Sequence, residues 1–328
     1  MNLGFWEKFP PKADPPSEEK NRSIMIAAPM ANVTDAAFRR MFLDCGRPDV
    51  FWTEFVSVEG LLSAGKKKLL VDFWYDKAEH PIVAQIFGAK PEQFRKVAEM
   101  IGELGFDGID INMGCPDKAV EKQGGGAALM KNINLAKEII RATKLGGGGL
   151  PVSVKTRIGY NKNEIATWIT ALLEESLAAI TVHLRTRKEM SDVPAHWELG
   201  PSIIELRNRY SPETLILGNG DLKTLEEAHA KVSEAGLDGA MIGRGVFGNP
   251  WFFSGRTPTM LERLTKLIEH TELFEKMFDK IKPFDIMKKH FKAYTTGFVG
   301  AKELRVLLMK TETAAEVKKI TEEFLKTI

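Results

Sequence analysis

The sequence repeats one pattern along most of its length: a short run of β-branched and other apolar residues, then an amphipathic stretch with apolar positions every three or four residues. Runs that are apolar throughout indicate strands buried on both faces, and the helices between them need a sheet surface against which to pack. The pattern therefore predicts a parallel sheet covered by helices. The expected strands are Ile24–Ala28, Val50–Thr53, Ile82–Phe87, Gly108–Asn112, Val152–Thr156, Ala179–His183, Leu215–Asn219 and Gly239–Gly243.

Such repeats, within about 250 residues, match an α/β fold of the (β/α)8 type, the TIM barrel. A doubly wound open sheet is the alternative, because it also alternates strands with helices. We assign the barrel to residues 24–255. Residues 256–328 contain only helical patterns and are expected to form a small all-helical C-terminal domain. Residues 1–23 are expected to form an irregular N-terminal arm, because proline fixes φ and removes a donor at Pro10, Pro11, Pro15 and Pro16.

Composition narrows the class of protein. No apolar run approaches the roughly 20 residues of a membrane span, and charges and prolines interrupt the N-terminal stretch, unlike a signal peptide. Cys45 and Cys115 are the only cysteines, too few for a disulfide framework or a cysteine-rich metal site. We therefore expect a cytoplasmic protein that has no membrane partner, and nothing in the sequence implies an obligate protein partner.

The charge is small but uneven. The net charge is +2, whereas residues 256–328 hold 15 Lys+Arg against 11 Asp+Glu. A basic helical tail fits a polyanionic partner, but a solvated helical surface gives the same count. Charge alone does not decide between them.

Polar residues end or follow the expected strands, where a barrel carries its functional side chains. A single one of them could simply end a strand, but so many together favour a shared site. Gln85 lies within the third strand, and the residues at or after the ends of the others, most of them polar, are Pro29-Met30-Ala31, Glu54, Asn112 to Cys115, Lys155 and Arg157, His183 and Arg185, Asn219-Gly220-Asp221 and Gly243-Arg244.

The last expected strand runs into a G-x-G-x-x-G sequence, Gly243 to Gly248. A dinucleotide fold is disfavoured, because that motif requires a further strand and an acidic residue after it. Glycines after the last two strands of a barrel are typical of a phosphate site, in which backbone amides and Arg244 would face the anion. Asn219-Gly220-Asp221 would form the other wall, and a pair of tight turns is the structural alternative.

Three further residues have chemistry suited to the same mouth. Lys155 and Gln85 offer the cation and the amide that the pyrimidine edge of a flavin needs. Cys115 lies in a Gly-Cys-Pro loop, and an ordinary thiol pKa of about 8.5 leaves it protonated and able to donate a proton near neutrality. Structural roles are the alternative for two of these residues. Lys155 could simply extend to solvent, and His183 could cap the end of its strand. Cys45 is expected to pack, and no metal site is expected.

Taken in order, these motifs resemble the tRNA-dihydrouridine synthases, most closely the bacterial B-type enzymes, over about residues 24–253. The motifs are Ala28-Pro29-Met30-Ala31, Gln85-Ile86-Phe87-Gly88, Asp110 to Pro116, Lys155-Thr156-Arg157, His183-Leu184-Arg185-Thr186, Asn219-Gly220-Asp221 and Gly243-Arg244-Gly245. The segment Arg187 to Trp197 departs from the family, which often has a Gln and an aromatic residue there. The departure leaves local RNA contacts and the target position open.

The resemblance implies an FMN-dependent enzyme that reduces the C5–C6 double bond of particular uridines in tRNA, with NADPH or NADH restoring the reduced flavin. It implies that Cys115 is the general acid, and that Asn112 and Arg157 contact the uracil. Lys288, Lys289, Lys292 and Arg305 of the tail would contact tRNA phosphates. The implied FMN site consists of Pro29, Met30, Ala31, Gln85, Lys155, His183, Asn219, Gly220, Asp221, Gly243 and Arg244.

Two other functions stay open on the sequence. One is an FMN barrel oxidoreductase that acts on a free pyrimidine, as dihydroorotate dehydrogenases do. The other is an RNA-binding barrel without turnover. The sequence specifies neither the uridine position, nor the choice between NADPH and NADH, nor the oligomeric state.

Overall fold

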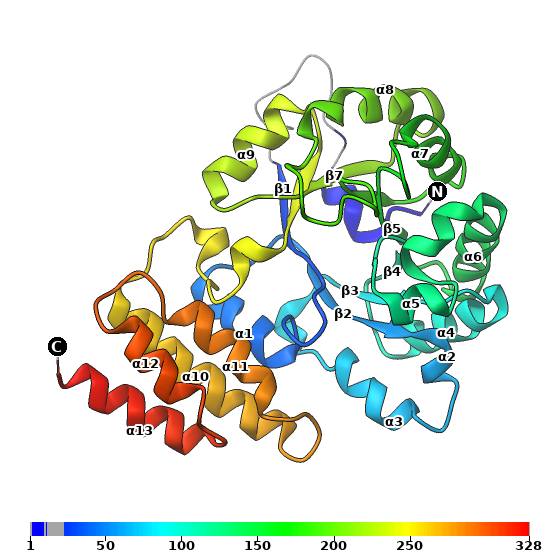
Figure 1. Cartoon of the computed structure of the whole chain (residues 1–328). Coiled ribbons are helices and arrows are strands. Elements are labelled where there is room, and N and C mark those ends of the chain that lie inside the picture. Colours follow the sequence, from blue (N-terminus) through cyan, green and yellow to red (C-terminus); the bar gives the residue numbers. More distant parts are fainter. Residues whose placement is uncertain (1, 10, 12–22, 328) are drawn as a thin grey trace.

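The computed structural model describes residues 2–9, 11 and 23–327 of the chain. Its centre is an eight-stranded parallel sheet with helices around it (Figure 1). The expected strands all form, with small shifts at their ends. Their bounds are β1 Ile24–Ala27, β2 Phe51–Ser57, β3 Ile82–Phe87, β4 Gly108–Asn112, β5 Val152–Arg157, β6 Ala179–His183, β7 Leu215–Asn219 and β8 Gly239–Ile242.

The strand order closes the sheet into a barrel. Strands β2 to β8 neighbour one another in sequence order, and β8 also pairs with β1. The remaining seam lies between β1 and β2, where the backbone N–H of Asp49 donates to Met25 O at 2.9 Å. In return, the N–H of Met25 donates to Asp49 Oδ2 at 2.8 Å. The predicted (β/α)8 fold is confirmed, and the doubly wound alternative is excluded by this order.

The long helices of the barrel follow the strands as expected, and local sequence fixes where they begin. The carboxylate of Asp35, for example, accepts the Phe38 N–H at 2.9 Å and caps the first helix. After β2 the chain makes only short helices, α2 (Val58–Leu61) and α3 (Lys66–Leu69), which are too short to show a periodic pattern. The long barrel helices are α1 Ala36–Cys45, α4 Pro91–Glu103, α6 Ile133–Gly146, α7 Ile165–Leu173, α8 Gly200–Tyr210 and α9 Leu225–Glu234.

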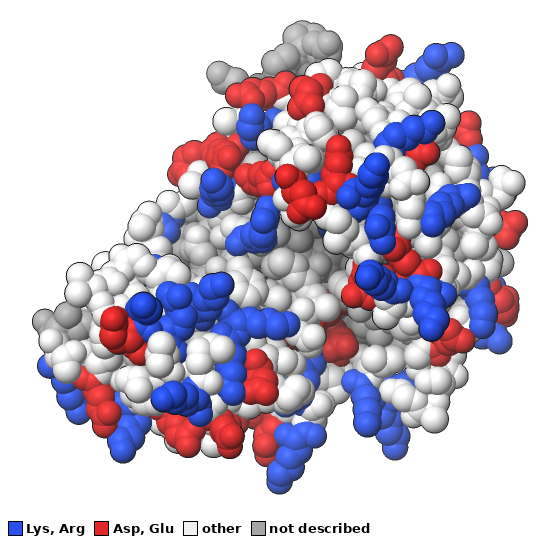
Figure 2. Space-filling model, viewed as in Figure 1, with Lys and Arg blue, Asp and Glu red and all other residues white. Residues whose placement is uncertain are grey.

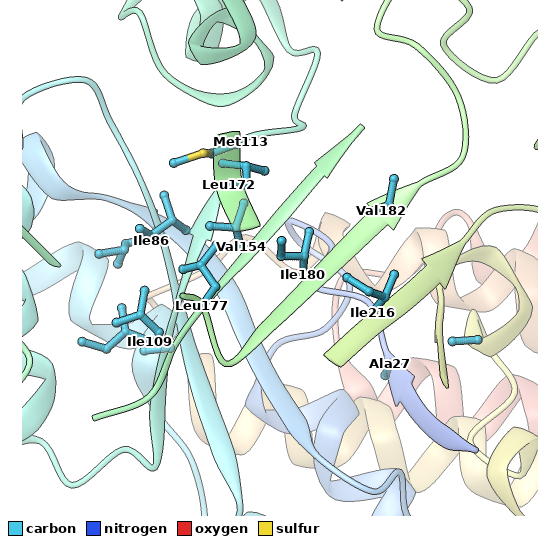
Figure 3. Packing of buried hydrophobic residues seen from close by; sticks show 14 of the residues in the cluster. Ala27, Ile86, Ile109, Met113, Val154, Leu172, Leu177, Ile180, Val182 and Ile216 are labelled. Carbon is cyan, nitrogen blue, oxygen red and sulfur yellow. The ribbon is translucent and has the colours of Figure 1, made fainter. Parts of the chain in front are cut away.

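The main core lies between the strands and the surrounding helices. Figure 3 shows Ile109, Val154, Ile180 and Ile216, from the neighbouring strands β4 to β7, within this layer. All four are fully buried, as expected of parallel strands whose two faces are both covered.

A second apolar cluster fills the inside of the barrel and includes a residue from the N-terminal arm. The arm was expected to be irregular, but Gly4–Lys8 form a 3-10 helix, η1. Its Trp6 is 2% exposed, with its ring centroid 5.9 Å from that of Trp52 on β2. Gly4 lies beside Pro151, just before β5, so η1 covers the N-terminal end of the barrel. The rest of the predicted arm, apart from residues 2–9, 11 and 23, lies outside the described residues.

After the barrel the chain forms four further helices, which we call the helical segment: α10 Met260–Phe278, α11 Asp285–Tyr294, α12 Ala301–Leu308 and α13 Ala314–Leu325. They pack around Leu264, Phe274 and Phe291, in a cluster that also includes Ala36 and Ala37 of α1. Because this cluster joins the helical segment to the barrel, the domain boundary at residue 255 remains a prediction.

No helix among the described residues has the length and apolar character needed to cross a bilayer.

Candidate active site at the carboxyl ends of the strands

A cavity of about 910 Å³ opens at the carboxyl ends of β1, β5, β6, β7 and β8. Most of the residues predicted to hold the cofactor meet there, although they come from distant parts of the sequence. They are Pro29, Met30, Lys155, His183, Asn219, Gly220, Asp221, Gly243 and Arg244. Among the described residues, no cluster of three or more metal-ligating side chains occurs.

The two glycine turns shape one side of the cavity. Gly220 has a φ of +139°, and a Cβ placed on it would lie 2.5 Å from the Cβ of Ala195. A Cβ on Gly243 would face open space, since the nearest atom, the Cβ of Ala28, is 4.0 Å away. A ligand can therefore approach the bare backbone at Gly243, as a phosphate site requires.

Asp221 holds two arginines of the cavity. Its carboxylate accepts from Arg244 Nη2 at 2.8 Å and from Arg185 Nη2, and the hydrogen bond from Arg185 keeps the pKa of Asp221 below its ordinary value. The Arg185 side chain is 3% exposed, whereas that of Arg244 is 73% exposed. Arg185 is therefore fixed, while Arg244 is free to move onto an anionic ligand. Arg185 was predicted only as one of the residues of a shared site after the strands, in the same motif as His183.

Lys155 and His183 are positioned by their neighbours. Lys155 Nζ donates to Asn219 Oδ1 at 3.1 Å, and burial lowers the pKa of Lys155 to about 8, with the charge of Arg157 adding to the effect. Arg185 Nη1 lies 3.1 Å from His183 Nε2. Because arginine can only donate, Nε2 must be the acceptor and the proton sits on Nδ1. Burial holds the pKa of His183 well below its ordinary value, so the imidazole is neutral.

Gln85 and Asn112 do not line the cavity but form a buried network beneath it. Gln85 Nε2 donates to Asp110 Oδ2 at 2.6 Å, and Gln85 Oε1 accepts from Asn112 Nδ2 at 3.0 Å. Asn112 Oδ1 accepts the N–H groups of Gly114 and Cys115 at 3.2 and 2.9 Å. Burial raises the pKa of Asp110 to about 6. Both ends of each amide are therefore engaged within the protein, and the network holds the loop that carries Cys115.

Cys115 is half-buried on that loop, and its carbonyl accepts the N–H of Ala127 at 2.9 Å. Burial raises the pKa of the Cys115 thiol, and the charges of Lys155 and Arg157 oppose this effect. The thiol therefore carries its proton near neutrality, close to the cation that lines the cavity. Cys115 itself does not line the cavity, and neither does Ala31, which is exposed.

Arg157 ties the Cys115 loop to the chain after β6. Its Nε donates to Gly114 O at 2.9 Å, and its Nη1 donates to Thr186 O at 3.0 Å and Met190 O at 3.2 Å. Arg157 is 6% exposed, so the structure gives it a positioning role. Residues 191–194, part of the segment that departs from the family, line the cavity.

Comparison with known proteins fits these features. The family described as "Dihydrouridine synthase (Dus)" matches residues 25–328. The chain belongs to the dihydrouridine synthase family. Two dihydrouridine synthases resemble it over nearly their whole length. "Probable tRNA-dihydrouridine synthase" of Staphylococcus aureus is 42% identical, over 99% of this chain and 96% of its own. "Probable tRNA-dihydrouridine synthase 2" of Bacillus subtilis is 40% identical, over 99% and 97%.

Solved structures show that the chain shares its fold with more distant proteins. Histamine dehydrogenase from Rhizobium sp. 4-9 matches with a TM-score of 0.51 and 11% identity, over 77% of this chain and 49% of that one. The 6-hydroxypseudooxynicotine amine oxidase from Pseudomonas geniculata N1 matches with a TM-score of 0.50 and 15% identity, over 70% and 46%. At such identities the likeness concerns the barrel fold alone.

The basic residues predicted to bind RNA on the C-terminal tail have different surroundings. Lys289 and Lys292 are exposed on α11, and Lys288 forms an ion pair with Asp285. Arg305 donates to Thr295 O at 2.6 Å and so caps the end of α11. Figure 2 shows Lys and Arg side chains gathered on the helical segment beside the recess that separates it from the barrel. None of the four tail residues lines the first cavity.

Proposed function

We propose that the protein is an FMN-dependent tRNA-dihydrouridine synthase, which reduces the C5–C6 double bond of uridine in tRNA with NADPH or NADH as reductant. The names of its relatives support tRNA as the substrate, and tRNA implies a cytoplasmic location. The observation that carries the proposal is the cavity at the carboxyl ends of the strands. There two glycine turns, two arginines and Lys155 converge on one space.

The residues present fit FMN. Gly243 leaves bare backbone facing open space, and Arg185 and Arg244 add donors that suit a phosphate. Lys155, held by Asn219, offers a cation to the pyrimidine edge of the ring system. The chemistry that bound FMN supplies is hydride transfer to C6 of the uracil. We assign Pro29, Met30, His183, Gly220 and Asp221 to the same site, because they line it. Ala31 and Gln85 stay in the proposal on the family resemblance alone.

Cys115 is our candidate for the general acid that protonates C5. Burial keeps its thiol protonated, and both Asn112 and Arg157 hold the loop on which it lies. Proton donation as the hydride arrives prevents a full enolate charge from building up on the uracil. We keep Asn112 and Arg157 as candidates for uracil contacts, although the protein engages most of their hydrogen-bonding groups.

The uridine must leave the RNA stack to reach the cavity, which costs a few kcal/mol. Contacts between basic residues and RNA phosphates can offset this cost. We therefore propose residues 256–328 as a tRNA-binding domain, in which Lys289 and Lys292 are exposed and available. Lys288 and Arg305 would have to leave their present partners before contacting RNA.

The proposal is tested with purified protein. We expect a yellow protein that releases FMN on denaturation, and that forms dihydrouridine when given NADPH and tRNA from cells lacking dihydrouridine synthases. Reduction of a free pyrimidine but not of tRNA would contradict the proposal and favour the free-pyrimidine oxidoreductase. A colourless protein that binds tRNA without changing it would favour the non-catalytic barrel.

A further inference from the structure

A buried ion pair joins the helical segment to the barrel beside the loop that follows β1. Lys282 lies between α10 and α11, and its Nζ contacts Glu54 Oε2 of β2 and Asp72 Oδ1, each at 2.7 Å. The side chains of Lys282 and Glu54 are 10% and 4% exposed, so solvent screens their attraction little. Lys282 Nζ also lies 5.1 Å from the centre of the Phe278 ring of α10. These contacts fix the position of the ammonium group.

The same carboxylate holds the loop after β1. Glu54 Oε1 accepts the backbone N–H of Asn32, whose φ of +55° is a left-handed conformation that needs support from its surroundings. Within this loop, the N–H of Met30 donates to Thr34 Oγ1 at 2.8 Å, and the N–H of Thr34 donates to Met30 O at 3.0 Å. Pro29 and Met30 line the first cavity, whereas Glu54 does not. Glu54 therefore supports one wall of that cavity from behind.

Glu54 depends on Lys282 for its charge. Burial raises the pKa of Glu54 to about 7, and the charge of Lys282 is the largest effect that opposes the rise. The carboxylates of Asp35 and Asp72 add to the rise. Without Lys282, Glu54 would take up a proton near neutral pH, and a carboxylic acid accepts a hydrogen bond less strongly than a carboxylate does. The hydrogen bond from Asn32 would weaken as a result.

We propose that Lys282 is a positioning residue for the cofactor site: through Glu54, it holds the loop after β1 in the conformation that receives FMN. The inference rests on the proposed function, which assigns the first cavity to FMN, and it adds a residue that does not line that cavity. A wall that is already in place spares the ligand the entropy cost of ordering it. The helical segment, to which we assign RNA binding, thereby also contributes to flavin affinity.

The first measurement is the dissociation constant for FMN, obtained from the flavin fluorescence that returns when the holoprotein is diluted. We expect Lys282→Met and Glu54→Met each to weaken FMN binding about 5-fold to 10-fold, as for the loss of one hydrogen bond. The double variant should bind FMN no more weakly than Glu54→Met, because Lys282 acts through Glu54. Asp72→Asn is the matched control, since it removes the other carboxylate from Lys282 and leaves the pair with Glu54 intact. Its dissociation constant should equal that of the wild-type protein.

The second measurement, urea denaturation at saturating FMN, separates positioning from a general loss of structure. Each single variant leaves a buried charged group without its partner, whereas the double variant replaces the pair by apolar side chains and should be more stable than either. We expect FMN binding to stay weak in the double variant although its stability recovers, and this comparison decides the test if Lys282→Met does not fold. Wild-type FMN affinity in Lys282→Met, or FMN affinity that recovers together with stability in the double variant, would overturn the inference. Failure of the proposed function is distinguishable, because the wild-type protein itself would then hold no FMN.

Discussion

Within the candidate site, we expect an added Cβ atom to destabilise the fold most at Gly220. Its φ of +139° is a backbone conformation that other residues rarely adopt, and a Cβ there would collide with Ala195. Ala195 belongs to the segment that lines the first cavity, and its N–H donates to Asp221 Oδ2 at 2.9 Å. One methyl group would therefore disturb the arginine pair as well as the turn.

We predict that Gly220→Ala lowers the free energy of unfolding by about 2–3 kcal/mol and weakens flavin binding, because strain and collision add. Gly236→Ala is the matched control. Gly236 also has a positive φ, +67°, but no atom lies within 4 Å of its added Cβ, so only the backbone strain of about 1 kcal/mol remains. Urea denaturation and flavin titration check both variants. An equal loss in the free energy of unfolding for the two variants would contradict the predicted collision with Ala195.

We predict that Cys115→Ala retains flavin but loses about 100-fold or more in the rate of uridine reduction, because the proton donor is absent. Cys45→Ala, in which the lost thiol packs against the helical segment, should keep the rate. The wild-type rate should fall at alkaline pH for two reasons. The Cys115 thiol donates a proton only while it is protonated. Lys155, with a pKa of about 8, loses its positive charge in the same range. A pH profile of single-turnover rates checks this, and a rate that rises with pH would refute the assignment.

At the scale of elements, the loop of Cys115 is held by contacts that cross the barrel mouth. Arg157 on β5 joins the carbonyl of Gly114 to those of Thr186 and Met190, which follow β6. We predict that Arg157→Met lowers kcat at least 10-fold while flavin stays bound, because the loop then loses its anchor. Arg95→Met, which removes surface pairs with Glu92 and Glu99 on α4, is the control. Loss of flavin from Arg157→Met, or an unchanged kcat, would contradict the anchoring role.

The strands could be predicted from the sequence because each is an apolar run, and both faces of each strand are covered in the barrel. It missed short helices such as α2, which contains a single turn and so no period. Strand β2 continues past Thr53 to Ser57, and within it the buried Glu54 pairs with Lys282 at 2.7 Å, a partner 228 residues away. For the site, residue type and position after a strand indicated the cavity residues. They could not indicate that Asp110 and Asn112 occupy both ends of Gln85.

At the scale of the whole molecule, two histidines lie where the helical segment meets the barrel. His270 of α10 and His290 of α11 are both fully buried, with ring centroids 4.6 Å apart. Phe38 of α1 contacts both rings, and Phe247, after β8, stacks on His290 at 5.1 Å. His270 Nε2 and both ring nitrogens of His290 have no hydrogen-bond partner among the described residues. A proton added to either ring would thus bring an uncompensated charge into an aromatic contact.

We predict that acid weakens the packing of the helical segment. Burial lowers the pKa of His290 to about 3 and that of His270 well below its ordinary value, so the folded protein binds fewer protons than the unfolded chain. Stability is then lost as pH falls below about 6.5, by about 2 kcal/mol per histidine near pH 5. His270→Phe with His290→Phe should remove this acid dependence, whereas His229→Gln, at an exposed position on α9, should not. Urea denaturation at several pH values measures it, and a double variant with wild-type acid sensitivity would refute it.

The helix η1, which carries Trp6, has a consequence for how ligands reach the barrel. Because Trp6 covers the end where the strands begin and apolar side chains fill the barrel behind it, ligands reach the first cavity from the side where the strands finish. Under the proposed function, a bulky RNA and a reducing nucleotide both have to enter by it. Access for both is thereby confined to the face that carries the two glycine turns, so changes in the loops after the strands can alter it while the strands stay as they are.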